Sequence, residues 1–375
     1  MKKIAYFGTN GNVSFTEKGF DHGFNAVGHN TGNLMFQYAL WKKIKNPKFN
    51  VDLNCDPYWV RENADLLVIP AANQVNPAWD LKWWGTFIEK IDLPVVILGL
   101  GAQAEDSSNT NLTLQEGTLK FLQEASKRTS SIGVRGAFTQ QVLFNAGIKN
   151  TTITGCPTQT ISDAISGESI QKNIDDLKLR SKTYGQKIRL GYLMGTMEPF
   201  CRDYEKKLFQ SIADENFDII LQTSPASMKA AFGFEITDEE QKNIDWVGNY
   251  LLGNRNFNFF SEKIKSGKIY SSAAYWIDDM LKYDAVIGMR IHGAIAAIQS
   301  GKLGICVVFD SRTLELCETM GYPYIDAKKL ASPKMSLHEI LELIEFDAEN
   351  FNSRRTDLIK KIETILEDAG CEIQK

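Results

Sequence analysis

The chain has 375 residues, 43% of them hydrophobic, which is more than one hydrophobic core usually supports. Its formal net charge of −4 excludes an overall electrostatic attraction to nucleic acid or acidic lipid, so any anion-binding site must be local. Length and composition therefore predict a soluble protein with two domains and no nucleic-acid partner.

The first residues predict neither a signal peptide nor a membrane span, because the apolar run before Gly8 is too short. We therefore expect a cytoplasmic protein without a transmembrane segment. The six cysteines include no C-x-x-C pair, and no acidic pair, such as Asp278-Asp279, has a histidine at metal-ligand spacing. The pattern predicts reduced thiols, and neither a metal nor another cofactor.

Short β-rich runs alternate with helical patterns along the chain, which is typical of parallel sheets in α/β folds. The predicted strands lie at residues 4–7, 66–69, 95–98, 131–134, 188–193, 219–222, 285–287 and 305–309. A polar stretch at 162–186 separates two groups of strands, and helical spacing at 337–367 predicts two surface helices. We predict two Rossmann-like α/β domains, 1–180 and 181–375, facing a cleft that holds the active site.

A long loop follows the first predicted strand, at residues 8–33. Long loops at strand ends often carry function. The alternative is a surface loop in which Thr31 or Asn33 caps the helical run that follows. Under the functional interpretation, the loop supplies four candidate contacts with a substrate: His29, Asn30, Gly32 and Asn33.

The segment after the strand at 285–287 carries the clearest chemical signal. The strand stops at Gly288, and small apolar residues from Gly293 onward predict a helix packed on a sheet. Arg290 and His292 then lie in the turn and the first helical turn. Unpaired backbone N–H groups and the positive end of the helix dipole favour a bound anion there.

Two further arginines occupy equivalent positions. Arg312 follows the strand at 305–309 and begins a helix, and Arg135 follows the strand at 131–134. A single arginine in such a place is more often a surface or salt-bridging residue. Convergence of these arginines with His292 would suit a ligand that carries two anionic groups.

Residues 99–104 formally fit the dinucleotide-binding pattern G-x-G-x-x-A after a strand. We reject that interpretation, because a polar run replaces the helix such a site needs, and Arg135 ends the next strand where an acidic residue is expected. A tight turn or pocket wall that includes Gln103 explains these glycines better. Three tryptophans are either core residues or sugar-stacking residues: Trp79, Trp83 and Trp84.

Taken together, several motifs resemble those of the polysaccharide pyruvyl transferase family over roughly residues 25–325. In chain order they are Gly99-Leu100-Gly101-Ala102-Gln103, Gly133-Val134-Arg135, Asn145-Ala146-Gly147, Gly155-Cys156-Pro157-Thr158, Met289-Arg290-Ile291-His292-Gly293 and Phe309-Asp310-Ser311-Arg312. The resemblance implies a fold similar to the GT-B glycosyltransferase architecture. It also implies phosphoenolpyruvate as donor and a pyruvate ketal on a cell-surface polysaccharide, such as an exopolysaccharide of the cell envelope, or on its lipid-linked precursor.

On this basis we expect the C-terminal domain to bind phosphoenolpyruvate and the N-terminal domain to face the saccharide acceptor. His292 is the candidate catalytic proton donor or acceptor, with a bound phosphate keeping its imidazolium available. Arg290, Arg312 and Arg135 would bind the donor's carboxylate and phosphate. The candidate acceptor or loop contacts are His29, Asn30, Gly32, Asn33 and Gln103.

Two alternatives remain open at this point. The first is a GT-B-type glycosyltransferase that uses a nucleotide sugar, which predicts binding of UDP or GDP. The second is a non-catalytic saccharide-binding protein, which predicts sugar affinity without release of phosphate from phosphoenolpyruvate.

Overall fold

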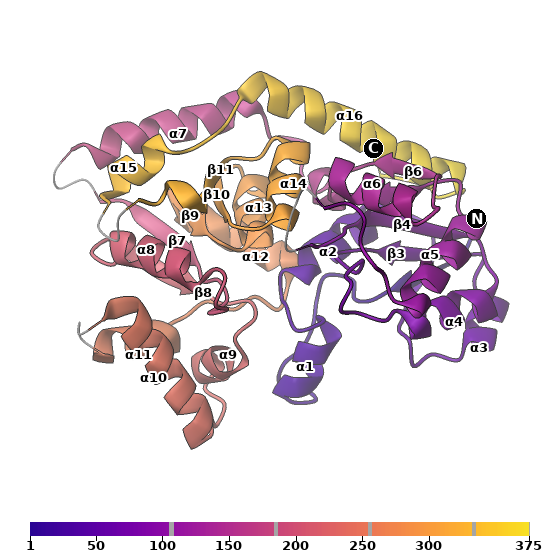
Figure 1. The fold of residues 1–375 in the computed structure, drawn as a ribbon, viewed down its shortest axis with the longest axis horizontal. Helices are drawn as coiled ribbons and strands as arrows, with labels where there is room; N and C mark the ends of the chain where they lie inside the picture. Colours follow the sequence, from indigo (N-terminus) through magenta and orange to yellow (C-terminus); the bar gives the residue numbers. More distant parts are fainter. Residues whose placement is uncertain (105–108, 184–186, 254–256, 332–334, 375) are drawn as a thin grey trace.

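The computed structural model describes residues 1–104, 109–183, 187–253, 257–331 and 335–374. These residues form two parallel β-sheets, each flanked by helices, which lie side by side (Figure 1). We refer to each sheet with its helices as the N-terminal unit and the C-terminal unit. The prediction of two Rossmann-like α/β units is confirmed.

The N-terminal sheet has the order β2-β1-β3-β4-β5-β6, with every neighbouring pair parallel. Its central strands are buried at every position, as expected for a parallel sheet covered on both faces. The strands are β1 (Ile4–Phe7), β2 (Lys48–Val51), β3 (Leu66–Pro70), β4 (Val95–Leu100), β5 (Ile132–Val134) and β6 (Thr151–Ile153).

The C-terminal sheet has the order β11-β10-β9-β7-β8, again with parallel pairs. In both sheets the strand order reverses direction along the sequence, which leaves a crevice at the carboxyl ends of the strands. The strands are β7 (Arg189–Leu193), β8 (Asn216–Ile220), β9 (Ala285–Gly288), β10 (Leu303–Val308) and β11 (Tyr324–Asp326).

Helices cover both sheets. Those preceding the C-terminal sheet are α1 (Phe20–Ala26), α2 (Asn33–Lys43), α3 (Pro57–Asn63), α4 (Lys82–Ile91), α5 (Glu116–Arg128), α6 (Ala137–Asn145), the short 3₁₀ helix η1 (Pro157–Thr160) and α7 (Gly167–Ser181). Those that follow are α8 (Arg202–Ile212), α9 (Pro225–Phe232), α10 (Asp238–Leu252), α11 (Phe257–Lys265), α12 (Ala273–Asp279), η2 (Met280–Lys282), α13 (Ile291–Gln299), α14 (Ser311–Met320), η3 (Ala327–Lys329), α15 (Leu337–Glu342) and α16 (Ala348–Asp368).

Helix α16 joins the two units, as its long path across the top of Figure 1 shows. Phe351 near its start is buried in the C-terminal core, whereas Ile362 and Leu366 pack with Ile4 and Leu98 of the N-terminal sheet. Helix α7 packs into the C-terminal core through three buried side chains: Ile170, Ile174 and Leu177. The boundary at residue 180 stays a prediction, and the packing groups α7 with the second core.

The predicted strands agree with the structure except at one strand and three omissions. The strand expected at 219–222 begins earlier, because β8 spans Asn216–Ile220. Strands β2, β6 and β11 were not predicted. Each has only three or four residues and mostly half-buried side chains, so none shows the apolar run that identifies a buried strand.

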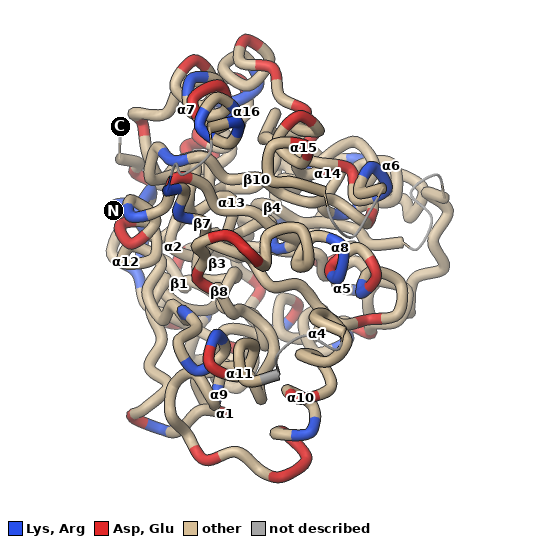
Figure 2. Tube along the Cα trace, turned by 90° about the vertical axis from the view of Figure 1, so that its left-hand side faces the viewer, with Lys and Arg blue, Asp and Glu red and all other residues tan. Residues whose placement is uncertain are grey.

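The trace in Figure 2 shows where the charged residues lie along the described chain. Acidic and basic residues are interspersed over most of the trace in Figure 2, in keeping with the small net charge of −4. Within the described ranges, no helix is both long and apolar enough to cross a membrane.

Candidate functional site

A small cavity of about 50 Å³ lies where the two units meet, at the carboxyl ends of β3, β5, β8, β9 and β10. We call it the arginine cavity. It is lined by Asn30, Asn33, Asn73, Arg135, Gln222, Met289, Arg290, Ile291, His292, Arg312 and Thr313. The three arginines and the histidine singled out from the sequence therefore meet at one place.

Arg290 and His292 are positioned by the turn between β9 and α13. Gly288 has a φ of 152°, and a Cβ there would lie 2.2 Å from the backbone oxygen of Leu193, so the turn requires glycine. Arg290 is the N-cap residue of α13, and no side chain caps this helix. Its first backbone N–H groups are therefore free of side-chain acceptors at the edge of the cavity.

Within the described chain, the guanidinium group of Arg290 has hydrogen-bond partners for only some of its N–H donors. One terminal nitrogen donates to the hydroxyl of Thr223, while the buried Nε has no hydrogen-bond partner among the described residues. Burial, with the charge of Arg312 adding to it, lowers the pKa of Arg290 to about 10. The guanidinium is still charged at neutral pH, although its burial makes the charged form less favourable than it would be in water.

Arg135 reaches the cavity from the opposite unit and is only 3% exposed. Its Nε donates to the backbone oxygen of Gly99 at 3.0 Å, and its Nη2 has no partner in the described part of the chain. Gly101 leaves room for this side chain, because a Cβ there would lie 2.7 Å from Arg135 Cδ. Gly101 thus leaves space for the Arg135 side chain, and Gly99 accepts one of its hydrogen bonds.

Arg312 lies in the first turn of α14 and pairs with Asp310 at 3.0 Å. Asp310 is also the N-cap of that helix and accepts from the backbone N–H of Thr313 at 2.8 Å. Within the described residues, it is the only carboxylate within 4.0 Å of any of the three guanidinium groups. The cavity therefore carries an excess of positive charge that a bound anion would neutralise.

His292 is 7% exposed, and its Nε2 lies 3.9 Å from the Cys156 sulfur while the ring packs on Phe36. Burial is the main reason that the pKa of His292 falls to about 3, and the charges of Arg135 and Arg312 add to the effect. The imidazole is neutral at pH 7 in this structure. The sequence predicted that His292 lies at a helix terminus. How deeply its side chain is buried depends on residues of both units.

Three of the four loop candidates lie at the cavity. Asn30 and Asn33 line it, and Gly32 forms part of its wall, because a Cβ there would lie 2.8 Å from Oε1 of Gln222 and 3.1 Å from Cβ of His292. His29 is instead exposed, with its Nε2 2.6 Å from Asn25 Oδ1, and it does not line the cavity.

The loop at 8–33 is part of the contact between the units. Asn12 forms a β-bridge with Ser272, and the Phe15 ring packs against Phe232, which belongs to the C-terminal unit. Gly32 is the N-cap of α2, without a side-chain cap, so the alternative in which Thr31 or Asn33 caps the helix is wrong.

Gln103 does not line the cavity but contacts a residue that does. Its Oε1 accepts from the Asn73 side chain at 2.8 Å, and Asn73 lines the cavity. Asn73 and Gln222 were not singled out from the sequence. Both follow or end a predicted strand, so the rule that polar residues at strand ends face the ligand would have found them.

The lining of the arginine cavity, as far as the structure describes it, includes none of the three tryptophans and none of the cysteines, although Cys156 lies beside His292. Trp84 packs on Phe7 in the N-terminal core, with ring centroids 4.0 Å apart, whereas Trp79 and Trp83 are 48% and 75% exposed. All six cysteines are free thiols. In the part of the chain that the structure describes, no group of three or more His, Cys, Asp or Glu side chains could hold a metal ion.

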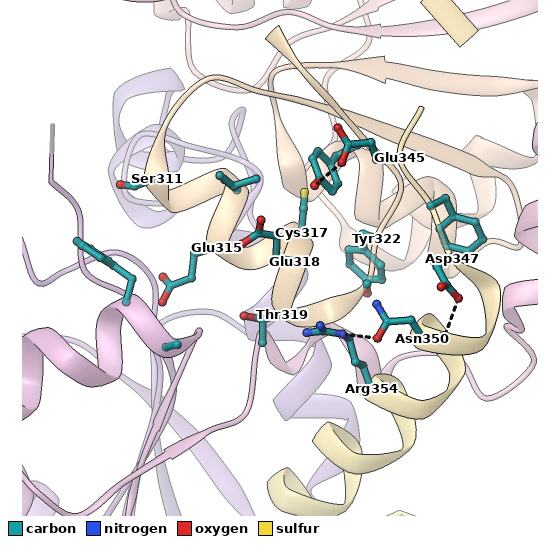
Figure 3. Close-up of a pocket in the computed structure, with 16 residues that line it drawn as sticks. Ser311, Glu315, Cys317, Glu318, Thr319, Tyr322, Glu345, Asp347, Asn350 and Arg354 are labelled. Atoms are coloured by element: carbon teal, nitrogen blue, oxygen red, sulfur yellow. Dashed lines mark hydrogen bonds between the residues drawn. The ribbon is translucent and has the colours of Figure 1, made fainter. Parts of the chain in front are cut away.

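A much larger cavity of about 730 Å³, the α14 pocket, lies between α14, α6 and the start of α16 (Figure 3). Its charged side chains are mostly engaged already. Glu345 accepts from the hydroxyl of Tyr324 at 2.8 Å and pairs with Lys329 at 2.6 Å, and Asp347 caps α16. Because its polar groups serve the fold, we consider the smaller arginine cavity the better candidate site.

Glu315 connects the α14 pocket with the arginine cavity. Its carboxylate accepts from the backbone N–H of Thr139 at 2.8 Å and from the Thr139 hydroxyl at 2.9 Å. Thr139 lies in the first turn of α6, four residues after Arg135. A carboxylate of the C-terminal unit thus caps the helix that follows the arginine of the N-terminal unit.

Comparison with solved structures gives weak similarities over nearly the whole chain. UDP-GlcNAc 2-epimerase from Neisseria meningitidis, bound to UDP-GlcNAc, is 11% identical with a TM-score of 0.35, covering 97% of this chain and 100% of the epimerase chain. The wall teichoic acid polymerase TagF is 10% identical with a TM-score of 0.35, covering 98% of this chain and 83% of the polymerase chain.

The search of curated proteins gives no match. By contrast, the model of one protein family, polysaccharide pyruvyl transferase, matches residues 30–311, about three quarters of the chain. The matched range contains Asn30 at its start and ends at Ser311, next to Arg312, so it spans nearly all of the arginine cavity. The chain belongs to the polysaccharide pyruvyl transferase family.

Proposed function

We propose that this protein transfers pyruvate from phosphoenolpyruvate to two hydroxyl groups of a saccharide and forms a pyruvate ketal. The observation that carries the proposal is the meeting of Arg135, Arg290 and Arg312 at one cavity with a single paired carboxylate. Family membership supports pyruvyl transfer to a polysaccharide. The reaction would take place in the cytoplasm, on a free or lipid-linked precursor of a cell-envelope polysaccharide.

The chemistry of the donor matches the cavity. Phosphoenolpyruvate carries a carboxylate and a phosphate, and guanidinium groups bind both through paired N–H donors. Arg135 and Arg290 each have a nitrogen without a partner among the described residues, and α13 begins without a side-chain cap. The donor would supply acceptors for these groups and offset the charge that burial now disfavours.

Donor binding requires a change in the cavity. A volume of about 50 Å³ holds a few water molecules, which is less than phosphoenolpyruvate needs. Asn73 and Arg135 belong to one unit, while Arg290 and Arg312 belong to the other. A small separation of the units would open the cavity, and closure on the donor would bring the arginines from both sides into contact with it.

The proton balance of the reaction gives His292 its role. The first sugar hydroxyl adds across the C=C double bond of phosphoenolpyruvate. Its oxygen bonds to the carbon that carries the phosphate, and a proton bonds to the CH₂ carbon, which becomes a methyl group. The second hydroxyl displaces phosphate, which carries that hydroxyl's proton away. We propose that His292, which is neutral before the donor binds, accepts the proton of the first attacking hydroxyl and passes it to the CH₂ carbon. The negative charge of the bound donor raises the low pKa of the imidazole so that it can hold this proton, while the arginines stabilise the departing phosphate.

Calorimetric titration with phosphoenolpyruvate tests the proposal without knowledge of the acceptor. We expect saturable binding to the wild-type protein and loss of most of that affinity in Arg290→Ala. Arg354→Ala is the matched control, because Arg354 lines the α14 pocket, and it should bind as the wild type does. Binding of UDP or GDP in place of phosphoenolpyruvate would contradict the donor and favour a glycosyltransferase.

A further inference from the structure

Glu205, near the start of α8, is a buried carboxyl group that the proposed reaction does not use. The side chain has 0% exposure. Its Oε1 accepts from the hydroxyl of Tyr192 and from the backbone N–H of Gly195, the latter at 2.7 Å. Its Oε2 is buried and has no hydrogen-bond partner in the described ranges. Burying a carboxyl oxygen without a hydrogen-bond partner costs free energy, unless a nearby charge or ligand offsets that cost.

The unpartnered oxygen lies beside the base of Arg290. A Cβ on Gly195 would lie 2.6 Å from Glu205 Oε2 and 3.2 Å from Cβ of Met289, the residue before Arg290. The buried Nε of Arg290 is also unpartnered. The two side chains are close enough that each charge shifts the pKa of the other, although no direct hydrogen bond joins them in the described residues.

Three titratable groups face Glu205 from the elements packed around it. Tyr192 comes from β7, Cys201 precedes α8, and Arg290 follows β9. Burial raises the pKa of Glu205 to about 7, and the hydrogen bonds from Tyr192 and Gly195 and the charge of Arg290 partly oppose the rise. Glu205 is therefore divided between its neutral and ionised forms near neutral pH.

We propose that Glu205 is a proton-linked counter-charge for Arg290, which takes up a proton on Oε2 when an anionic donor occupies the arginine cavity. The inference rests on the proposed function, because it takes phosphoenolpyruvate as that anion. Before binding, the carboxylate partly balances Arg290. Once the donor is bound, its negative charge balances Arg290 and repels the carboxylate, which then binds a proton from solvent.

The sign of the resulting pH dependence follows from this exchange. A nearby anion raises the pKa of Glu205 further, so the donor complex binds more protons than the free protein. Donor affinity should therefore be nearly constant below about pH 7 and should fall above it, by up to about tenfold per pH unit. At pH 7 the uptake would be up to about half a proton per donor bound.

The test is calorimetric titration with phosphoenolpyruvate in buffers of different ionisation enthalpy, from pH 6 to pH 9. The variants are Glu205→Gln, which mimics the protonated side chain, and Glu215→Gln as the matched control. Glu215 is another carboxyl group with a raised pKa, but burial and Asp214 cause that shift and no arginine of the cavity contributes to it. Ionisation of the donor itself affects all three proteins equally and cancels in the comparison.

We expect Glu205→Gln to lose the part of the proton uptake centred near pH 7 and to bind the donor more tightly than the wild type above pH 8, whereas Glu215→Gln should behave as the wild type. Tyr192→Phe serves as a second variant should Glu205→Gln fail to fold. It removes a hydrogen bond that favours the carboxylate, so the fall in affinity should begin at higher pH.

Two outcomes would overturn the inference, and they are distinguishable. Normal donor binding with the same proton uptake in Glu205→Gln and the wild type, or with an unshifted profile in Tyr192→Phe, would remove the role of Glu205 and leave the proposed function intact. Absence of phosphoenolpyruvate binding by the wild-type protein would contradict the proposed donor and, with it, the linkage.

Discussion

The α14 pocket is the larger of the two cavities, but the arginine cavity has more buried polar atoms without a hydrogen-bond partner in the described part of the chain. The α14 pocket has a volume of about 730 Å³ and the arginine cavity about 50 Å³. Yet the larger space is lined by carboxylates that cap helices or pair with neighbours, as Asp347 and Glu345 do. The smaller one holds buried guanidinium nitrogens without partners, on Arg135 and Arg290.

The comparison shows that volume is a poor guide to a site for a small, doubly charged ligand. A folded protein pairs its buried polar groups unless another molecule completes them, so unpaired charge is the more informative observation. Substitutions in the two regions test whether chemistry belongs to the arginine cavity and structural support to the α14 pocket.

The largest effect is expected for His292→Ala. Loss of a positioned proton acceptor should lower turnover by about 10²- to 10⁴-fold, measured as phosphate release from phosphoenolpyruvate with acceptor present. Donor affinity should change little, because the arginines remain. His338→Ala is the control, since His338 lies outside the cavity near Ser181 and Glu342. Near-normal turnover in His292→Ala would assign the proton transfer to another group.

Arg312→Ala should weaken phosphoenolpyruvate binding by about 10- to 100-fold, the loss of a charged hydrogen-bonding partner for the donor. Asp310 would still cap α14 through the N–H of Thr313, so the helix should stay folded. Titration calorimetry measures the affinity, and thermal unfolding checks the fold. Equal loss of affinity in Arg354→Ala, a change in the α14 pocket, would contradict the assignment of the site.

Glu315 lines the α14 pocket and caps α6, the helix that follows Arg135, so it tests the link between the two regions. Glu315→Ala leaves the buried N–H of Thr139 without its acceptor, and we expect a loss of about 1–2 kcal/mol in the free energy of unfolding, measured with urea. Glu318→Ala, an exposed position on the same helix, should change stability by less than about 0.5 kcal/mol. An unchanged stability in Glu315→Ala would show that the contact is not formed in solution.

The smallest effect is expected for Glu345→Gln in the α14 pocket. The variant loses an exposed ion pair with Lys329 but keeps an acceptor for Tyr324, so stability should change by less than about 1 kcal/mol. Donor affinity and turnover should stay within twofold of the wild type. A large loss of turnover with unchanged donor affinity would instead place the saccharide acceptor in the α14 pocket.

The lining of the arginine cavity was largely predictable where a residue follows a strand. Arg135, Arg290 and Arg312 were identified because each lies at a strand-to-helix turn, and parallel strands bring such turns to one edge. His29 was an expected contact on the basis of loop position alone, and it lies outside the cavity. Loop residues have no such periodic constraint, so their side-chain directions are set by contacts with distant parts of the chain.

Apolar periodicity is a local property, so the alternation of buried strands and helices can be read from the amino-acid sequence and predicts two parallel sheets. How the two units pack against each other depends on contacts between residues that lie far apart in the chain. This packing buries His292 between Phe36 and Cys156, and it lets Glu315 cap a helix whose N–H donor lies 176 residues away. Burial and charge balance are sums over neighbours from both units, and local patterns do not contain those neighbours.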